Sequence, residues 1–255
     1  MLRKVSDIKG CRLRATNGVI GRGKELYFSD EHWTVEYLVA NTGNWMHGWD
    51  VLIPTLAVRS ICNAQKRLID VNLTKSQIES SPSVQENPPV SLRFHIQHHR
   101  HLEWPYDWQK PAWFRNFSPP DNRYLSDSAQ SAPALHQPAD VPGWQSTHEV
   151  AGYSVEARNG KAGVVKDFIF DDANWTVNYI VVKTRGWWTS NQVLVPTDKV
   201  ASVVWSSASV TVELDCATIR NAPQFDLSTP ISRDYEAKVR YYYFGDTRQE
   251  WHLAA

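Results

Sequence analysis

The chain contains two related stretches, NGVIGRGKELYFSDEHWTVEYLVA at residues 17–40 and NGKAGVVKDFIFDDANWTVNYIVV at residues 159–182. The relationship extends on both sides. Aligned without gaps at an offset of 142 residues, residues 10–58 and 152–200 share 20 identities among 49 pairs. Self-similarity at a fixed offset is the sequence signature of a repeated structural unit. The sequence therefore predicts that one folding unit has been duplicated.

Each copy predicts short β-strands. The dipeptides Asn17-Gly18 and Asn159-Gly160 favour type I′ hairpin turns, in which both central residues have positive φ. Residues 34–41 alternate between two faces, as in a strand with one face buried. Many short strands separated by turn residues predict a small barrel or sandwich.

Helices are predicted after the strands of each copy. Thr74 and Gln77 fit a capping box, and Asp215 is the equivalent first cap in the second copy. A further helix is predicted after Ser232. Its residues that share one face are Tyr235, Val239 and Tyr242.

These patterns predict a mainly β fold with two small barrels in tandem, each followed by short helical segments and joined by an irregular linker. The linker is rich in Pro, Ser, Ala, Asp and Gln and has little periodicity. The predicted parts are a first barrel at 1–81, its helical arm at 82–117, the linker at 118–147, a second barrel at 148–223 and a C-terminal helical arm at 224–255.

The repeated motifs resemble the PRC-barrel family, whose barrels occur in the H subunit of photosynthetic reaction centres and in the ribosome maturation factor RimM. The similar residues are GVVKDFIFDD at 163–172 and YLVANTGNW at 37–45, with a strand ending in Pro54 or Pro196. Gly23 departs from the family pattern and indicates either a loosened strand or a β-bulge. The resemblance implies two all-β barrels of the PRC type that act as protein-contact modules.

Composition excludes several classes of protein. The 27 basic and 27 acidic residues leave no positive excess for general nucleic-acid binding, so no nucleic-acid partner is expected. No stretch approaches the roughly 18 consecutive apolar residues of a membrane span. Residues 1–7 lack the apolar core of a signal peptide, which predicts a cytoplasmic protein.

Two groups of residues have the chemistry of metal ligands. His95, His98, His99 and His101 have helical spacing that could supply ligand pairs, but the second copy has no such cluster. Asp30, Asp167, Asp171 and Asp172 lack the spacing of a calcium loop, and Asp at such positions is typical of turns. We therefore expect no metal site and no cofactor.

No catalytic residues are predicted. The segment Gly21-Arg22-Gly23-Lys24 lacks the spacing of a phosphate-binding loop and lies inside a predicted strand. No nucleophile elbow of the G-x-S-x-G type is present. Cys11, Cys62 and Cys216 fit neither a disulfide framework nor a zinc site. The sequence therefore indicates a protein that is not an enzyme.

The tryptophans fall into two groups. Trp33 and Trp175 recur at a strand start and are predicted to be packing residues. The candidate interaction residues lie in the loops that precede the proline-terminated strands and are Trp45, Trp49, Trp187 and Trp188. Interface anchors are enriched in Trp. These loop residues either pack the two barrels together or bind an external partner.

The leading hypothesis is a protein-interaction or scaffold module built from two barrels that pair within the chain, with an unknown protein partner. One alternative is a metal-responsive or enzymatic protein that uses the His-rich segment. Another is a ribosome- or RNA-associated factor similar to RimM, which the balanced charge disfavours.

Overall fold

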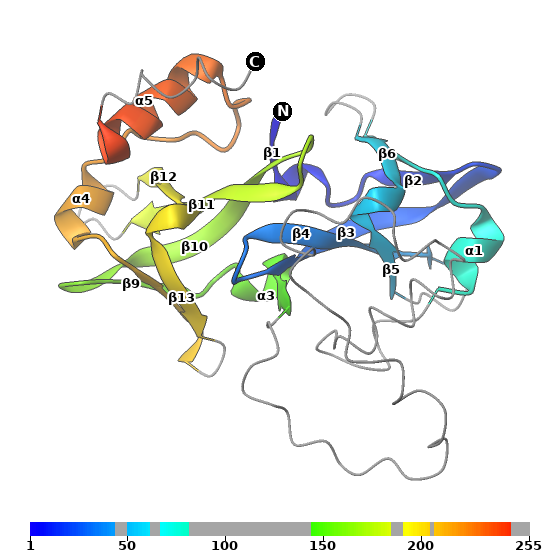
Figure 1. Ribbon diagram of the computed structural model, residues 1–255, viewed down its shortest axis with the longest axis horizontal. Coiled ribbons are helices and arrows are strands. Elements are labelled where there is room, and N and C mark those ends of the chain that lie inside the picture. The colour runs from blue at the N-terminus through cyan, green and yellow to red at the C-terminus, as the bar shows by residue number, and fades with distance from the viewer. Residues whose placement is uncertain (44–49, 62–66, 82–143, 185–190, 205–206, 246–255) are drawn as a thin grey trace, which may run out of the picture.

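The computed structural model describes residues 1–43, 50–61, 67–81, 144–184, 191–204 and 207–245. The structure is mainly β, as predicted, and its two halves lie side by side (Figure 1). The predicted arm at 82–117 and most of the predicted linker fall outside the described residues. No helix in the described ranges is long and apolar enough to cross a membrane.

The first half consists of seven strands with short helical turns between and after them. Its elements are β1 (Leu2–Lys4), η1 (Val5–Asp7), β2 (Arg12–Ala15), β3 (Gly18–Ser29), β4 (Thr34–Asn41), β5 (Asp50–Pro54), η3 (Thr55–Ala57), β6 (Val58–Ile61), β7 (Leu68–Val71) and α1 (Lys75–Glu79).

The second half repeats this order and ends in a longer helix. Its elements are β8 (Trp144–Ser146), α3 (Thr147–Val150), β9 (Ser154–Ala157), β10 (Gly160–Asp171), β11 (Thr176–Thr184), β12 (Gln192–Pro196), η7 (Thr197–Lys199), β13 (Val200–Val204), β14 (Ser209–Val212), α4 (Cys216–Arg220) and α5 (Arg233–Phe244). Each element of the first half has its counterpart 141 or 142 residues later, as the repeat predicts.

All strands in the described ranges belong to one sheet of 14 strands. Each half has the same internal order, β6-β7-β2-β3-β4-β5 and β13-β14-β9-β10-β11-β12, and β4 meets β11 in the middle. The predicted mainly β fold is confirmed, whereas the described strands do not form two closed barrels. Among the described strands no ladder joins β5 to β6, because the turn η3 separates them after Pro54, so the sheet stays open.

The two halves share one hydrophobic core. A single cluster of buried side chains includes Leu26 and Phe28 from the first half and Phe168 and Phe170 from the second. The rings of Phe28 and Phe168 lie 5.4 Å apart between centroids. This cluster couples the packing of the two halves, and each half also has a smaller buried cluster of its own.

The hairpin turns are present, but the predicted turn type is wrong. Ala15 pairs with Gly18, so the two-residue loop is Thr16-Asn17, one residue earlier than predicted. Gly18 has φ of +134°, whereas Asn17 is not among the described residues with positive φ. The Asn17 side chain instead accepts a hydrogen bond from the backbone N–H of Lys75 at the start of α1, over 2.9 Å.

The predicted bulge at Gly23 is confirmed. The register of β3 against β4 shifts between Gly23 and Glu25, and the register of β10 against β11 shifts at the matching place, between Val165 and Asp167. Glycine is therefore not required for the bulge. At Gly23 a Cβ atom would lie only 2.8 Å from the carbonyl oxygen of Ile8, so this position needs glycine because of close backbone approach.

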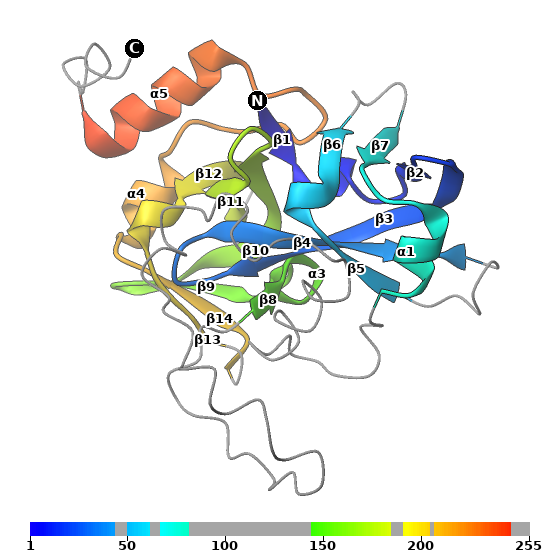
Figure 2. The same cartoon turned by 45° about the vertical axis from the view of Figure 1, so that its right-hand side comes forward.

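Two of the three predicted helix caps are found, whereas Asp215 occupies the N-cap position of α4 without a capping hydrogen bond from its side chain. Thr74 and Gln77 form the capping box of α1, and Ser232 caps α5 by accepting from the N–H of Tyr235. Helix α5 lies over β11 and β12 (Figure 2). Its buried face is formed by Tyr235, Val239 and Tyr243 rather than by Tyr242. The buried residues are therefore spaced i, i+4, i+8 instead of the predicted i, i+4, i+7. The Tyr242 hydroxyl instead donates a hydrogen bond to the carbonyl of Thr218.

Candidate functional site

The junction between the halves has approximate two-fold symmetry. Thr34 pairs with Thr176, its own counterpart in the repeat. The N–H of Val35 donates to the carbonyl of Trp175 over 2.7 Å, and the N–H of Val177 donates to the carbonyl of Trp33 over 2.6 Å. Because equivalent residues exchange the same bond in both directions, the two halves are related as the subunits of an isologous dimer are.

Each half also gives a short strand to the other. Strand β1 pairs with β10, with Leu2 opposite Asp171, and β8 pairs with β3, with Trp144 opposite Ser29. These are equivalent registers in the repeat. The last residues of the predicted linker thus form β8 and the start of α3. The exchange means that each half completes the sheet of the other.

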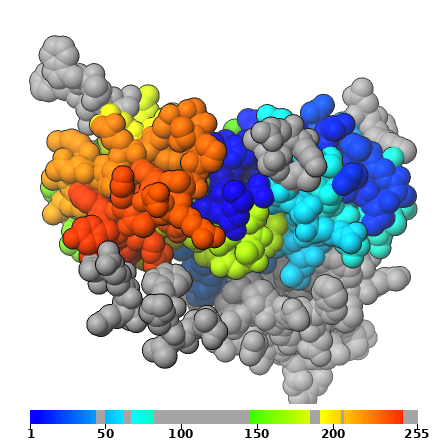
Figure 3. Space-filling view, turned by 90° about the horizontal axis from the view of Figure 1, so that it is seen from above, coloured from blue at the N-terminus to red at the C-terminus, as the bar shows by residue number. Residues whose placement is uncertain are grey.

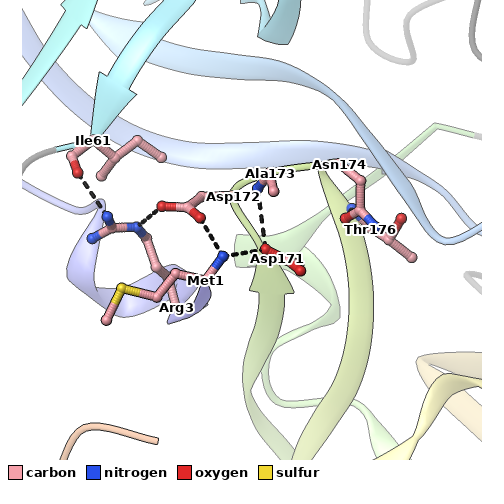
Figure 4. A network of polar contacts seen from close by, with 8 residues as sticks. All are labelled: Met1, Arg3, Ile61, Asp171, Asp172, Ala173, Asn174 and Thr176. Carbon is pink, nitrogen blue, oxygen red and sulfur yellow. Dashed lines mark hydrogen bonds and ion pairs between the residues drawn. The ribbon is translucent and has the colours of Figure 1, made fainter. Parts of the chain in front are cut away.

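Polar side chains fix the first of these exchanged strands (Figure 4). Arg3 binds Asp172 through Nε at 2.5 Å and donates through Nη2 to the carbonyl of Ile61 at 2.7 Å. The terminal amine of Met1 binds Asp171 and Asp172. Burial raises the pKa of Asp172, but the hydrogen bonds from the terminal amine and Arg3 outweigh burial, so the pKa lies below its usual value. In Figure 3 the first residues, in dark blue, lie between the orange C-terminal segment and the cyan strands.

The second exchanged strand, β8, has a matching contact in which the donor side chain is neutral. Gln145, the counterpart of Arg3, donates to Asp30, the counterpart of Asp172, over 3.0 Å. The geometry of the pair is therefore conserved between the halves while its chemistry differs. A neutral amide replaces the guanidinium, so the charged contact is stronger at the β1 end of the junction.

Two buried carboxylates bind the end of one exchanged strand and the residues that follow the other. Asp167 accepts from the N–H of Ser6 at 3.2 Å, and Glu25, its counterpart, accepts from the hydroxyl of Ser146. Burial raises the pKa of Asp167, and the hydrogen bonds from Ser6 and Phe168 offset this only in part. Both carboxylates therefore join one half to the other.

The prediction that Trp33 and Trp175 are packing residues is confirmed. Trp33 stacks on Phe28 with centroids 5.3 Å apart, and Trp175 stacks on Phe170 at 5.5 Å. Both tryptophans have positive φ, 52° and 59°, which is rare outside glycine. This backbone conformation turns their carbonyl groups toward the other half, where they accept the symmetric hydrogen bonds described above.

The predicted interaction residues cannot be placed. Trp45, Trp49, Trp187 and Trp188 all lie outside the described residues, as do the histidines His95, His98, His99 and His101. The strands that lead into the two tryptophan loops are described. β4 and β11 meet at their first residues and then run in opposite directions.

The acidic residues do not gather at one point. Asp171 shapes the turn after β10 by accepting from the N–H of Ala173, as predicted. Asp167 lies apart from it, in the contact with Ser6. Among the described residues no group of three or more His, Cys, Asp or Glu is placed to hold a metal ion. Residues Gly21–Lys24 lie within β3, as expected for a strand rather than a phosphate loop.

The second half has the element order and the motif of a known domain type. Residues 146–212 match the PRC-barrel domain. The match begins at the last residue of β8 and ends at the last residue of β14, so it covers the sheet of the second half and stops before α4. No curated protein matches the chain. The match identifies the second half as similar to a PRC-barrel domain and assigns no activity to it.

Sequence reasoning missed the residues of the junction. Arg3 and Gln145 lie just before the aligned repeat, at the same offset of 142, and their neighbours share no identity: Leu2 aligns with Trp144 and Lys4 with Ser146. Extending the alignment upstream would have suggested that 144–146 has the structure of 2–4. It would not have shown that the two strands are exchanged.

Proposed function

We propose that the chain is a tandem PRC-barrel protein, in which residues 4–71 form a second domain of the same type as residues 146–212. The observation that carries the proposal is the equivalence of elements: every strand from β9 to β14 has a counterpart from β2 to β7, with the same neighbours. The bulges and the capping asparagines recur at equivalent positions as well.

We further propose that this protein is a non-enzymatic docking scaffold. The shared core and the exchanged strands support this function, because they give a body in which surfaces of both halves are held in fixed relation. The titratable groups of the junction support it too: Asp172, Asp167 and Glu25 are each engaged by the other half rather than directed to a common cleft.

The contact surface that we propose for a protein partner consists of the two tryptophan loops. β4 has eight residues and β11 has nine, and both start at the junction. At about 3.3 Å per residue, their far ends are separated by about 50 Å along the strands. This separation favours binding of external partners over mutual packing of Trp45 and Trp187 across the junction.

Comparison of two variants tests the docking function. A tagged intact chain is used to capture partners, alongside the double variant Trp45→Ala, Trp187→Ala and the control Tyr241→Ala. Tyr241 is 66% exposed on α5, so the control also removes exposed aromatic surface. The proposal predicts unchanged melting for all three proteins and loss of a specific partner only in the double variant. A lower melting temperature of the double variant, with the same partners captured, would show that the tryptophans pack within the chain.

A further inference from the structure

A surface cavity of about 570 Å³ lies on the outer side of the first half, where β2, β7 and β6 are neighbours. Clefts that hold small molecules have volumes of roughly 300–1,000 Å³. The polar residues that line this cavity are Arg14, Thr16, Arg59, Ser60 and Asp70. They come from three different strands and the β2–β3 turn, so the cavity is a product of the fold rather than of one flexible segment.

The acidic group of the cavity is already satisfied. Asp70 accepts two hydrogen bonds from Arg14, at 2.5 and 2.8 Å, and one from the hydroxyl of Ser60 at 3.1 Å. The hydrogen bond from Arg14 is the main cause that holds the pKa of Asp70 below its usual value. The carboxylate therefore stays ionised and neutralises one of the two guanidinium groups.

The second guanidinium, that of Arg59, leaves the cavity with a net positive charge. Arg59 is the extra residue of a bulge in β6, where Val58 pairs with Val71 and Ser60 pairs with Asp70. Bulges redirect side chains and are common beside binding sites. Arg59 is exposed, and no hydrogen bond or ion pair to it is present within the described part of the chain.

The other half shows which features belong to the fold and which to this cavity. The bulge is repeated in β13, and Ser60 has Ser202 as its counterpart. The charged residues are not repeated: Glu156, Ala201 and Thr211 stand where the first half has Arg14, Arg59 and Asp70. The two guanidinium groups are therefore specific to the first half and are not needed to build the sheet.

We propose that this cavity is an anion-binding site that takes a small phosphate-bearing molecule. A guanidinium binds phosphate through paired N–H donors, and Arg59 has its donors available at the cavity. Arg14 is held at the same wall by Asp70, and Thr16 also lines the cavity, so Arg59 is the residue that we assign to the anion. Among the described residues, none from the tryptophan loops lines this cavity, so the proposed anion site does not depend on the docking function.

Two variants of the full chain test the site. Arg59→Ala gives the residue that the second half has at this position, so the fold should tolerate it. Arg12→Ala is the matched control, because it removes the same charge from an exposed position of β2 that does not line the cavity. Inorganic phosphate and ribose 5-phosphate are titrated separately at constant ionic strength, with backbone amide resonances as the readout.

We expect saturable shifts at Thr16, Ser60 and Val71, with affinity reduced about tenfold by Arg59→Ala and nearly unchanged by Arg12→Ala. Tighter binding of ribose 5-phosphate identifies a phosphate ester as the ligand class, and equal binding identifies free phosphate. Shifts that do not saturate at millimolar concentrations, or equal losses in both variants, would overturn the proposal, because either result indicates only general charge attraction.

Discussion

Thr34 of β4 lies directly opposite Thr176 of β11, and the two residues are equivalent positions of the repeat. A residue that pairs with its own counterpart marks the axis of a two-fold arrangement. The exchanged strands β1 and β8 lie on either side of this axis. The duplicated units are therefore joined as an intramolecular dimer rather than strung one after the other.

The aromatic centre of the junction should stabilise both halves together. Phe28 is fully buried, stacks on Trp33 of its own half and contacts Phe168 of the other. We expect Phe28→Ala to lower the free energy of unfolding by about 3–5 kcal/mol. Chemical denaturation followed by far-UV circular dichroism and tryptophan fluorescence measures the change, and both signals should shift together.

Two controls accompany this variant. Val19→Ala removes apolar surface at a position that is 45% exposed and should have little effect. Phe28→Leu keeps part of the ring volume and allows measurement if the alanine variant does not fold. Two separated transitions for Phe28→Ala, one near the original midpoint, would contradict the shared core.

Two aspartates at the junction should respond to neutralisation with opposite signs. Hydrogen bonds lower the pKa of Asp172, whereas burial raises the pKa of Asp167. At neutral pH we expect Asp172→Asn to reduce stability by about 1–3 kcal/mol, because it weakens the charged hydrogen bonds from Arg3 and the terminal amine. Asp167→Asn should leave stability unchanged or raise it, because the amide oxygen can still accept from Ser6 and Phe168 without a buried charge.

The pH dependence follows from the direction of each pKa shift. A lowered folded pKa gives Asp172 a stabilising effect above its unfolded pKa, which is lost as pH falls through the folded pKa. A raised folded pKa makes ionised Asp167 costly at neutral pH, and protonation relieves this cost as pH falls. Melting curves from pH 7 to pH 3 should thus show the Asp172→Asn deficit shrinking. A deficit that grows with acid would refute the assignment.

The two capping asparagines should contribute similar amounts. The side chain of Asn17 accepts from Lys75 N–H, and that of Asn159 accepts from Cys216 N–H, over 2.9 and 2.8 Å. Each replacement by alanine should cost about 1 kcal/mol, the usual value for loss of a helix cap. Thermal melting of the two single variants and the double variant measures this. Strong non-additivity would mean that the caps are coupled through the junction.

Much of the fold could be predicted from the sequence because repetition and alternation are local signals. The duplicated strands and the capping box at Thr74 are readable from residue type and spacing. The turn lies one residue earlier than predicted, and the side chain of Asn17 accepts a hydrogen bond from the N–H of Lys75, 58 residues later in the sequence. A hydrogen bond between residues so far apart depends on tertiary structure and cannot be recognised from the local sequence.

The arrangement of the halves was not predictable in the same way. β1 and β8 are three residues long, too short for a periodic pattern, and their partners lie in the other half. Pairing partners of a strand depend on the whole sheet rather than on the strand itself. The same holds for the candidate site. Residue type and loop position suggest Trp45 and Trp187 as interface residues, but they do not define the surface that a partner would contact.

The central claim is that strand exchange makes one body of the two halves. A specific protease site inserted between residues 118 and 143 allows the chain to be cut while β8 and the second half stay intact. Size-exclusion chromatography with light scattering then measures the mass of the cut protein under native conditions. We predict that the two fragments elute together at the mass of the uncut chain and separate only in denaturant, since β1 and β8 each remain paired in the other fragment. Two folded fragments that separate without denaturant would contradict the account.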